Sequence, residues 1–168
     1  MKKLFLPAVI IATIVLSGCS ITTNNTSPKT NQTENTNTEE KTPSGKTLDY
    51  SNQKLTRVPA SVFNQTNAEV LDLSSNQISG SLPGEIRFLK NLKTLNASDN
   101  LMTGVPAEIG QLSDLEVLDL SNNQLTGLPN ELANLKNLKT MNLSGNNYSQ
   151  QDLDYIKQRL PNTTFILQ

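Results

Sequence analysis

The fold of this chain is decided by the stretch Leu115-Glu116-Val117-Leu118-Asp119-Leu120-Ser121-Asn122-Asn123-Gln124-Leu125. Leucine fills its first, fourth, sixth and last positions and asparagine its ninth, in the pattern L-x-x-L-x-L-x-x-N-x-L. Related copies begin at Gly45, Ala68, Leu92 and Leu138, so that successive copies are 23, 24, 23 and 23 residues apart. Self-similarity at a fixed period of this length predicts an array of stacked units.

Each copy is expected to contribute one short strand. In its L-x-L core, as at Leu118 and Leu120, alternate side chains point inward, and parallel stacking of the strands builds one sheet with neighbours about 4.8 Å apart. Return segments such as residues 83–89 and 129–135 carry apolar residues at three-residue spacing and predict short helical or 3-10 turns. The first four copies end in an apolar residue followed by proline, at Val58-Pro59, Leu82-Pro83, Val105-Pro106 and Leu128-Pro129.

The pattern resembles that of leucine-rich-repeat proteins, over about residues 45–168. The resemblance implies an α/β fold, a right-handed solenoid shaped as a short curved horseshoe. Its parallel sheet would form the concave face, and short helical or 3-10 turns the convex face. Five repeats would start near residues 45, 68, 92, 115 and 138.

Both ends of the array carry capping features. Residues 150–160 predict an amphipathic helix with Ser149 as its N-cap and with Leu153, Ile156 and Leu160 facing inward. The run 165–167 predicts a last strand, which completes a C-terminal cap over residues 149–168. The first copy, around Leu48, matches the pattern least well and is expected to be the N-terminal cap.

The first 18 residues have the pattern of a secretory signal peptide. Lys2 and Lys3 precede an apolar stretch over residues 4–16, which is too short for a normal transmembrane helix. The run Leu16-Ser17-Gly18-Cys19 resembles the lipobox of bacterial lipoproteins. This resemblance implies cleavage before Cys19, a diacylglyceryl group on its thiol, and a membrane anchor with two acyl chains.

Residues 19–44 are predicted to be a disordered tether behind the lipidated cysteine. They are rich in Thr and Asn, and Ile21 is their only large apolar residue. Such a segment cannot bury enough apolar surface to offset the entropy lost on ordering. The expected organisation is therefore a signal peptide over residues 1–18, a tether over 19–44 and a repeat domain over 45–168.

The composition argues against catalysis. The chain has no His, one Cys and a formal net charge of −1. It therefore lacks the commonest general base, a Cys-based zinc cluster and the charge excess typical of nucleic-acid binding. We expect no enzyme activity, cofactor, metal or nucleic-acid partner. A pair of carboxylates on neighbouring strands, Asp49 and Asp72, has the residue types of a retaining glycosidase but no other feature of one.

The candidate binding residues occupy the non-leucine strand positions of the concave face. Lys and Glu alternate at the second position and predict ion pairs between neighbouring strands, while Asp or Asn fills the fifth position. An asparagine column, by contrast, is expected to satisfy backbone groups where the chain leaves each strand. The candidate binding residues are Lys46, Asp49, Glu69, Asp72, Lys93, Asn96, Glu116, Asp119, Lys139 and Asn142, and the structural column is Asn76, Asn100, Asn123 and Asn146.

The function these features favour is a membrane-anchored binding module of the cell envelope, with a protein or glycan partner. Its expected location is the outer membrane if the host has one, and otherwise the outer face of the plasma membrane. Two alternatives are a structural spacer lipoprotein without a discrete ligand and an adhesin or effector that acts on another cell. Binding through the caps, the convex loops or the tether is the alternative to the concave face.

Overall fold

The computed structural model describes residues 45–168. The predicted signal peptide, lipobox, Cys19 and tether lie outside the described residues. No helix within residues 45–168 has the length and apolar character needed to cross a bilayer.

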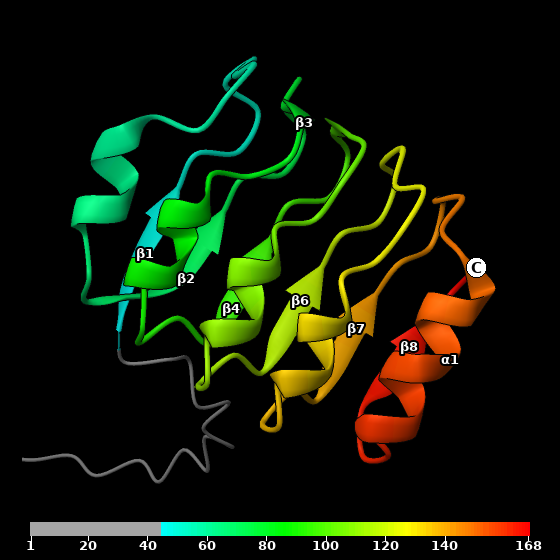
Figure 1. Cartoon of the computed structure of the whole chain (residues 1–168). Helices are drawn as coiled ribbons and strands as arrows, with labels where there is room; N and C mark the ends of the chain where they lie inside the picture. Colours follow the sequence, from blue (N-terminus) through cyan, green and yellow to red (C-terminus); the bar gives the residue numbers. More distant parts are fainter. Residues whose placement is uncertain (1–44) are drawn as a thin grey trace, which may run out of the picture. The chain divides into compact units, whose positions relative to one another are not determined.

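One six-stranded parallel sheet runs through the described part of the chain, with its strands side by side in chain order (Figure 1). The first five strands each hold a buried residue, such as Leu71, Leu95 and Leu118, all with no exposed surface, and Phe165 of the last strand is partly buried. Removing such a leucine from water contributes about 1.5–3 kcal/mol, so the repeated leucines are the main source of stability. The strands are β1 (Lys46–Asp49), β2 (Ala68–Asp72), β4 (Thr94–Asn96), β6 (Val117–Asp119), β7 (Thr140–Asn142) and β8 (Thr164–Ile166).

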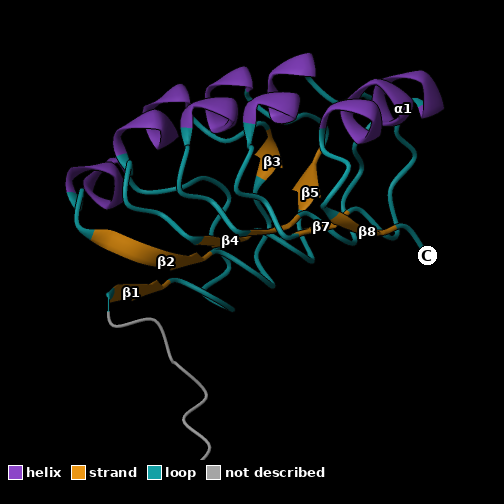
Figure 2. Cartoon of the chain, turned by 90° about the horizontal axis from the view of Figure 1, so that it is seen from below, coloured by secondary structure: helices purple, strands orange, loops and turns teal. Residues whose placement is uncertain are grey.

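Short 3-10 helices lie on the side of the core opposite the sheet (Figure 2). A proline precedes each of them with a φ between −61° and −72°, and its carbonyl accepts the first turn's hydrogen bond, as from Val62 to Pro59 (3.0 Å). Proline suits this position because its ring fixes φ near the required value. The helices are η1 (Ala60–Asn64), η2 (Gly84–Phe88), η3 (Ala107–Gln111) and η4 (Asn130–Asn134). The predicted leucine-rich-repeat architecture is confirmed.

The chain leaves the first five strands of this sheet through a residue in the left-handed region. Gly145 tolerates such a φ without steric cost, and Asn and Asp tolerate it better than most residues, whereas Ser75 is unusual there. The values are 53° at Asn52, 55° at Ser75, 55° at Asp99, 52° at Asn122 and 69° at Gly145. In the last four of these turns, the next residue is the repeat asparagine, which points back toward the core.

A second, two-stranded sheet joins the second and third repeats, which the sequence analysis did not predict. Its strands are β3 (Ser79–Gly80) and β5 (Leu101–Met102). Leu101 donates its amide to the Ile78 carbonyl (2.9 Å), and Gly80 has a φ of 75°. Strands of two residues are too short to show the alternation from which a strand is predicted.

The C-terminal cap consists of α1 (Gln150–Arg159) and β8. The Ser149 side chain accepts a hydrogen bond from the Asp152 amide (3.4 Å), as predicted for the N-cap. Leu153 and Ile156 are buried as expected. Phe165 packs against the core, but Ile166 points to the other side of β8 and is 42% exposed, because side chains alternate along a strand.

Candidate interaction surface

The asparagine column is used entirely within the scaffold. Asn123, with 7% of its surface exposed, accepts the Met102 amide at Oδ1 (3.0 Å) and donates Nδ2 to the carbonyls of Ala97, Leu120 and Ser121 (3.0–3.1 Å). Each bond set links a turn to the repeat before it, and no buried side-chain nitrogen or oxygen within residues 45–168 lacks a partner. Equivalent bonds are made by Asn76, Asn100 and Asn146.

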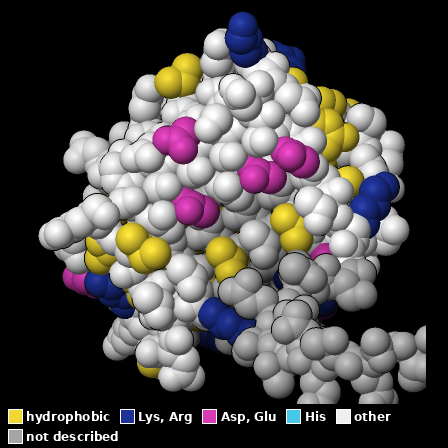
Figure 3. All heavy atoms as spheres, turned by 180° about the vertical axis from the view of Figure 1, so that it is seen from behind, with side chains coloured by type: hydrophobic (Ala, Val, Ile, Leu, Met, Phe, Trp, Pro, Cys, Tyr) yellow, Lys and Arg dark blue, Asp and Glu magenta, His cyan; other side chains and the backbone are white. Residues whose placement is uncertain are grey.

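All ten candidate binding residues lie on or beside the strands of the parallel sheet, on the side away from the 3-10 helices. We call this surface the sheet face. Residues such as Asp72 and Asp119 are half-buried, whereas Lys46 and Asp49 at the first strand are exposed. Acidic side chains gather near the middle of the sheet face, with basic ones toward its margin (Figure 3). The structure thus brings the candidates together as parallel columns across the strands.

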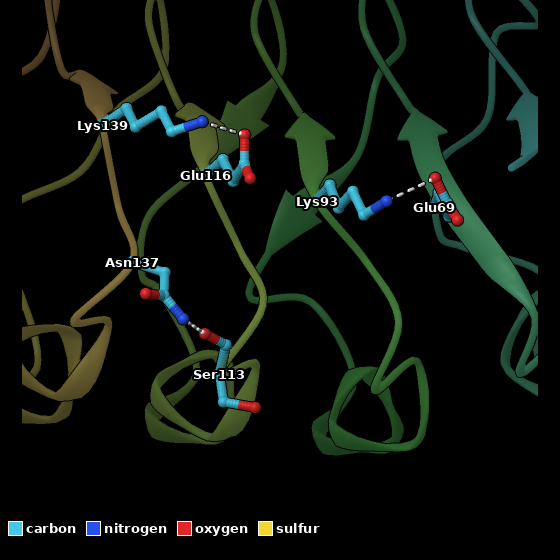
Figure 4. Close-up of polar contacts among 6 residues, drawn as sticks. All are labelled: Glu69, Lys93, Ser113, Glu116, Asn137 and Lys139. Atoms are coloured by element: carbon cyan, nitrogen blue, oxygen red, sulfur yellow. Dashed lines mark hydrogen bonds and ion pairs between the residues drawn. The ribbon is translucent and has the colours of Figure 1, made fainter. Parts of the chain in front are cut away.

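The charged column forms ion pairs between neighbouring repeats (Figure 4). The Lys93 ammonium lies 2.9 Å from the Glu69 carboxylate, and the Lys139 ammonium lies 2.6 Å from that of Glu116. The hydrogen bond to Glu69 raises the pKa of Lys93 above its ordinary value. Lys46, at the edge of the sheet, instead donates to the Gln65 side-chain oxygen. The column therefore contains two similar Glu–Lys pairs, one in each half of the array.

The aspartate and asparagine column is held by a neighbouring serine column that the sequence analysis did not single out. Asp119 Oδ1 accepts both the amide (2.9 Å) and the hydroxyl (2.6 Å) of Ser121, and Asp49 Oδ1 accepts the same two groups of Ser51. The Ser51 amide, followed by its hydroxyl, lowers the pKa of Asp49. Each serine stands two residues after its Asp or Asn, and this spacing was the available signal.

Asp49 and Asp72 are register partners on adjacent strands, but their environment does not suit acid–base catalysis. Each carboxylate accepts a hydrogen bond from the serine two residues further along its own chain. The pKa of Asp49 is lowered, whereas a general acid needs a raised pKa. Within residues 45–168, no group of three or more His, Cys, Asp or Glu side chains could hold a metal ion.

Two exposed aromatic side chains lie on the helical side, which carries the convex loops and the C-terminal cap that were alternatives to the concave face. The Arg87 guanidinium stands 4.7 Å from the ring centroid of Phe88 on η2, and the Arg159 guanidinium stands 3.6 Å from that of Tyr155 on α1. Phe88 is 46% and Tyr155 36% exposed. These two pairs sit on different elements and do not define one surface.

Comparison with known proteins shows which family these features represent. A leucine-rich-repeat family model matches residues 46–102 and 91–147, and the chain belongs to the leucine-rich-repeat family. No curated protein matches the chain.

Several solved structures share this fold. A leucine-rich-repeat protein of Leptospira interrogans is 42% identical, with a TM-score of 0.61 over 64% of this chain and 27% of its own. Internalin C2 of Listeria monocytogenes is 26% identical, with a TM-score of 0.64 over 73% of this chain and 51% of its own. The ectodomain of the Arabidopsis thaliana receptor kinase GASSHO1/SCHENGEN3, solved in complex with Casparian strip integrity factor 2, is 32% identical, with a TM-score of 0.57 over 66% of this chain and 14% of its own. This chain therefore corresponds to about a quarter of the Leptospira protein and to half of the internalin.

Proposed function

We propose that this chain is a membrane-anchored binding module of the cell envelope, which contacts a protein partner through the sheet face. The observation that carries the proposal is the sheet face itself. Five of the six strands hold exposed or half-buried polar side chains in regular columns, while the leucines and the asparagine column lie behind them. A rigid sheet that fixes many polar groups at repeated spacing suits recognition of an extended surface better than enclosure of a small substrate.

The relatives support a protein partner. The fold is shared with a plant receptor ectodomain whose structure contains Casparian strip integrity factor 2, and with internalins. Fold alone does not define function, so the polar columns of this chain are the main support for a protein partner, and the relatives add an analogy. A glycan partner is the second ligand class that polar columns of this kind could serve.

The membrane anchor in this proposal rests on the sequence. The run Leu16-Ser17-Gly18-Cys19 follows an apolar stretch of signal-peptide length, and lipidation of Cys19 would hold the repeat domain at the envelope. The proposed location is the outer membrane, or the outer face of the plasma membrane in a host without one.

The spacer alternative also has one supporting observation. The Glu69–Lys93 and Glu116–Lys139 pairs satisfy part of the charge of the sheet face internally. A spacer lipoprotein would capture no specific partner, and an adhesin or effector would capture one only from another cell.

A crosslinking pull-down from intact host cells tests the proposal. The test variant carries Lys93→Glu, Asn96→Arg and Asp119→Lys on the sheet face. A matched control carries Lys90→Glu, Asn134→Arg and Glu131→Lys at exposed positions near or on the 3-10 helices, with the same change in net charge. We expect wild type and control to capture the same protein and the folded sheet-face variant to lose it. Capture by all three forms would place binding elsewhere, and capture by none would favour the spacer or an adhesin or effector whose partner lies on another cell.

A further inference from the structure

The sheet face carries the same polar site twice. Each site spans two neighbouring strands. The first strand and the residues beside it contribute Glu, Val and Asp, and the second contributes Lys, Thr and Asn. We call these sites the first unit and the second unit. The first unit consists of Glu69, Val70, Asp72, Lys93, Thr94 and Asn96, and the second unit of Glu116, Val117, Asp119, Lys139, Thr140 and Asn142.

The two units agree in geometry as well as in sequence. Val70 pairs in register with Thr94, as Val117 does with Thr140. Each unit contains one Glu–Lys ion pair, at 2.9 Å and 2.6 Å (Figure 4). They differ around the aspartate, since Asp119 also accepts the Nδ2 of Asn142 at Oδ2 (3.0 Å) and the hydroxyl of Ser121 at Oδ1 (2.6 Å). A carboxylate has about four acceptor positions, so both aspartates keep capacity for a ligand.

The distance between the units restricts the ligand. Asp72 and Asp119 lie two strands apart in the same register, which corresponds to about 9.6 Å. A polyproline II helix has three residues per turn and a rise of 3.1 Å, so every third side chain recurs on one side after about 9.3 Å. Side chains on one face of an extended β-strand recur after about 6.8 Å. An α-helix presents side chains on one face at every turn of about 5.4 Å, so they recur after about 5.4 and 10.8 Å. The polyproline II repeat is the closest of the three.

The charges of the sheet face indicate which kind of side chain the ligand carries at each repeat. In each unit the glutamate is already paired with its lysine, and the aspartate has no basic side chain in its own column. The two columns that follow along the strands, one of serines and one containing Asp99, also lack Lys and Arg. Acidic groups accordingly dominate the middle of the sheet face (Figure 3). The ligand side chain opposite each aspartate is therefore a cation, and the half-buried Val70 and Val117 offer apolar contact beside it.

We propose that the sheet face binds a polyproline II segment of the partner protein that carries Lys or Arg at every third residue. Two consecutive basic side chains then lie at Asp72 and Asp119, with the segment running across the strands. This proposal rests on the proposed function and specifies the chemistry of the partner. A polyproline II segment is largely ordered before binding, which lowers the entropy lost on association.

Two peptides of identical composition test the spacing. The regular peptide is (Pro-Pro-Lys)4, and the irregular peptide has the same residues with its lysines at alternating separations of two and four. Both are titrated to millimolar concentration into the ¹⁵N-labelled full chain, and dissociation constants are taken from amide shifts. We expect wild type to bind the regular peptide about three- to fivefold more tightly, the effect of one additional exposed ion pair. The largest shifts should lie along β2, β4 and β6.

Conservative variants assign the contacts. In Asp119→Asn, and equally in Asp72→Asn, the advantage of the regular peptide should disappear, whereas Asp114→Asn, an exposed residue outside the columns, should retain it. Equal binding of both peptides by wild type, or no shift on the sheet face, would overturn the inference. Shifts there with a β-1,4-linked N-acetylglucosamine tetrasaccharide and not with peptide would assign the face to glycan. The two proposals can fail separately. If the sheet-face variant loses its partner in the pull-down but wild type binds both peptides equally, the proposed function stands and this inference is wrong.

Discussion

At the scale of single residues, the side chain of each buried asparagine forms hydrogen bonds with several backbone groups. Asn123, with 7% of its surface exposed, bonds the Met102 amide of β5 and three carbonyls that lie just beyond β4 and β6. A buried polar group left without a partner costs about 1–3 kcal/mol. An amide side chain suits this position because its nitrogen donates hydrogen bonds to the carbonyls and its oxygen accepts one from the backbone amide.

Replacing this asparagine should destabilise the array. We expect Asn123→Ala to lower the free energy of unfolding by about 3 kcal/mol, because the buried amide and carbonyls lose their partner. The control is Gln124→Ala, an exposed neighbour that should change stability by less than about 0.5 kcal/mol. Urea denaturation measures both, and a loss below about 1 kcal/mol for Asn123→Ala would contradict the role given to the column.

The titration behaviour of Asp49 and Lys93 predicts where stability depends on pH. The folded pKa of Asp49 is lowered, so its contribution is present above its unfolded pKa and is lost as pH falls below about 4. The folded pKa of Lys93 is raised, so its contribution is present below about pH 10 and is lost above it. The chain has no His to titrate between these limits.

We therefore expect the denaturation midpoint to stay constant between about pH 5 and 9 and to fall at both extremes. Ser51→Ala should move the pKa of Asp49 only part of the way back to its ordinary value, because the Ser51 amide, the larger cause, remains. A carboxylate-detected NMR titration follows Asp49 directly. A stability transition centred near pH 6.5 would disagree with this assignment.

At the scale of elements, neighbouring 3-10 helices pack so closely that one position requires glycine. A Cβ built on Gly110 of η3 would lie 2.2 Å from the Glu131 carbonyl oxygen of η4. Backbone cannot move away as a flexible side chain can, so the two helices would have to separate.

Gly110→Ala should accordingly lower the free energy of unfolding by about 1–3 kcal/mol. Gly104→Ala is the matched control, because a Cβ there would meet nothing within 4 Å and its stability should remain within about 1 kcal/mol of wild type. Thermal unfolding of the two variants gives the comparison, and equal midpoints would show that η3 and η4 can separate without cost.

Most of the helices and strands could be predicted from the sequence, and a few could not. The leucine period predicted the sheet, and the three-residue apolar spacing of the return segments predicted the 3-10 turns, because these features recur in successive copies. The Ser149-capped helix was predicted from its amphipathic pattern and its N-cap. The second sheet of β3 and β5 and the exposed side of Ile166 were missed, since each occurs once and has no period. The columns of the candidate surface could be predicted from the sequence. The hydrogen bonds from serine that orient Asp49 and Asp119 could not, because they depend on the geometry of the turns.

At the scale of the whole molecule, we expect a lipid anchor at Cys19 to hold the folded sheet face at the membrane. Cys19→Ser should release the protein from membranes, because the proposed diacylglyceryl group would have no thiol to modify. Fractionation of host cells with detection of the repeat domain measures this, and the Ser20→Ala variant serves as a control that keeps the cysteine. Tight membrane association of Cys19→Ser would contradict the anchor while leaving the binding face untouched.

We propose that the sheet face is the surface that binds the partner. A photo-crosslinking amino acid placed on either side of the core distinguishes this surface from the 3-10 helices. It is placed at Thr94, half-exposed on β4, or at Gln111, exposed on η3 on the opposite side of the core. In intact host cells we expect a defined crosslinked protein from position 94 and none from position 111. A crosslink from position 111 alone would contradict this proposal and move the binding surface to the 3-10 helices.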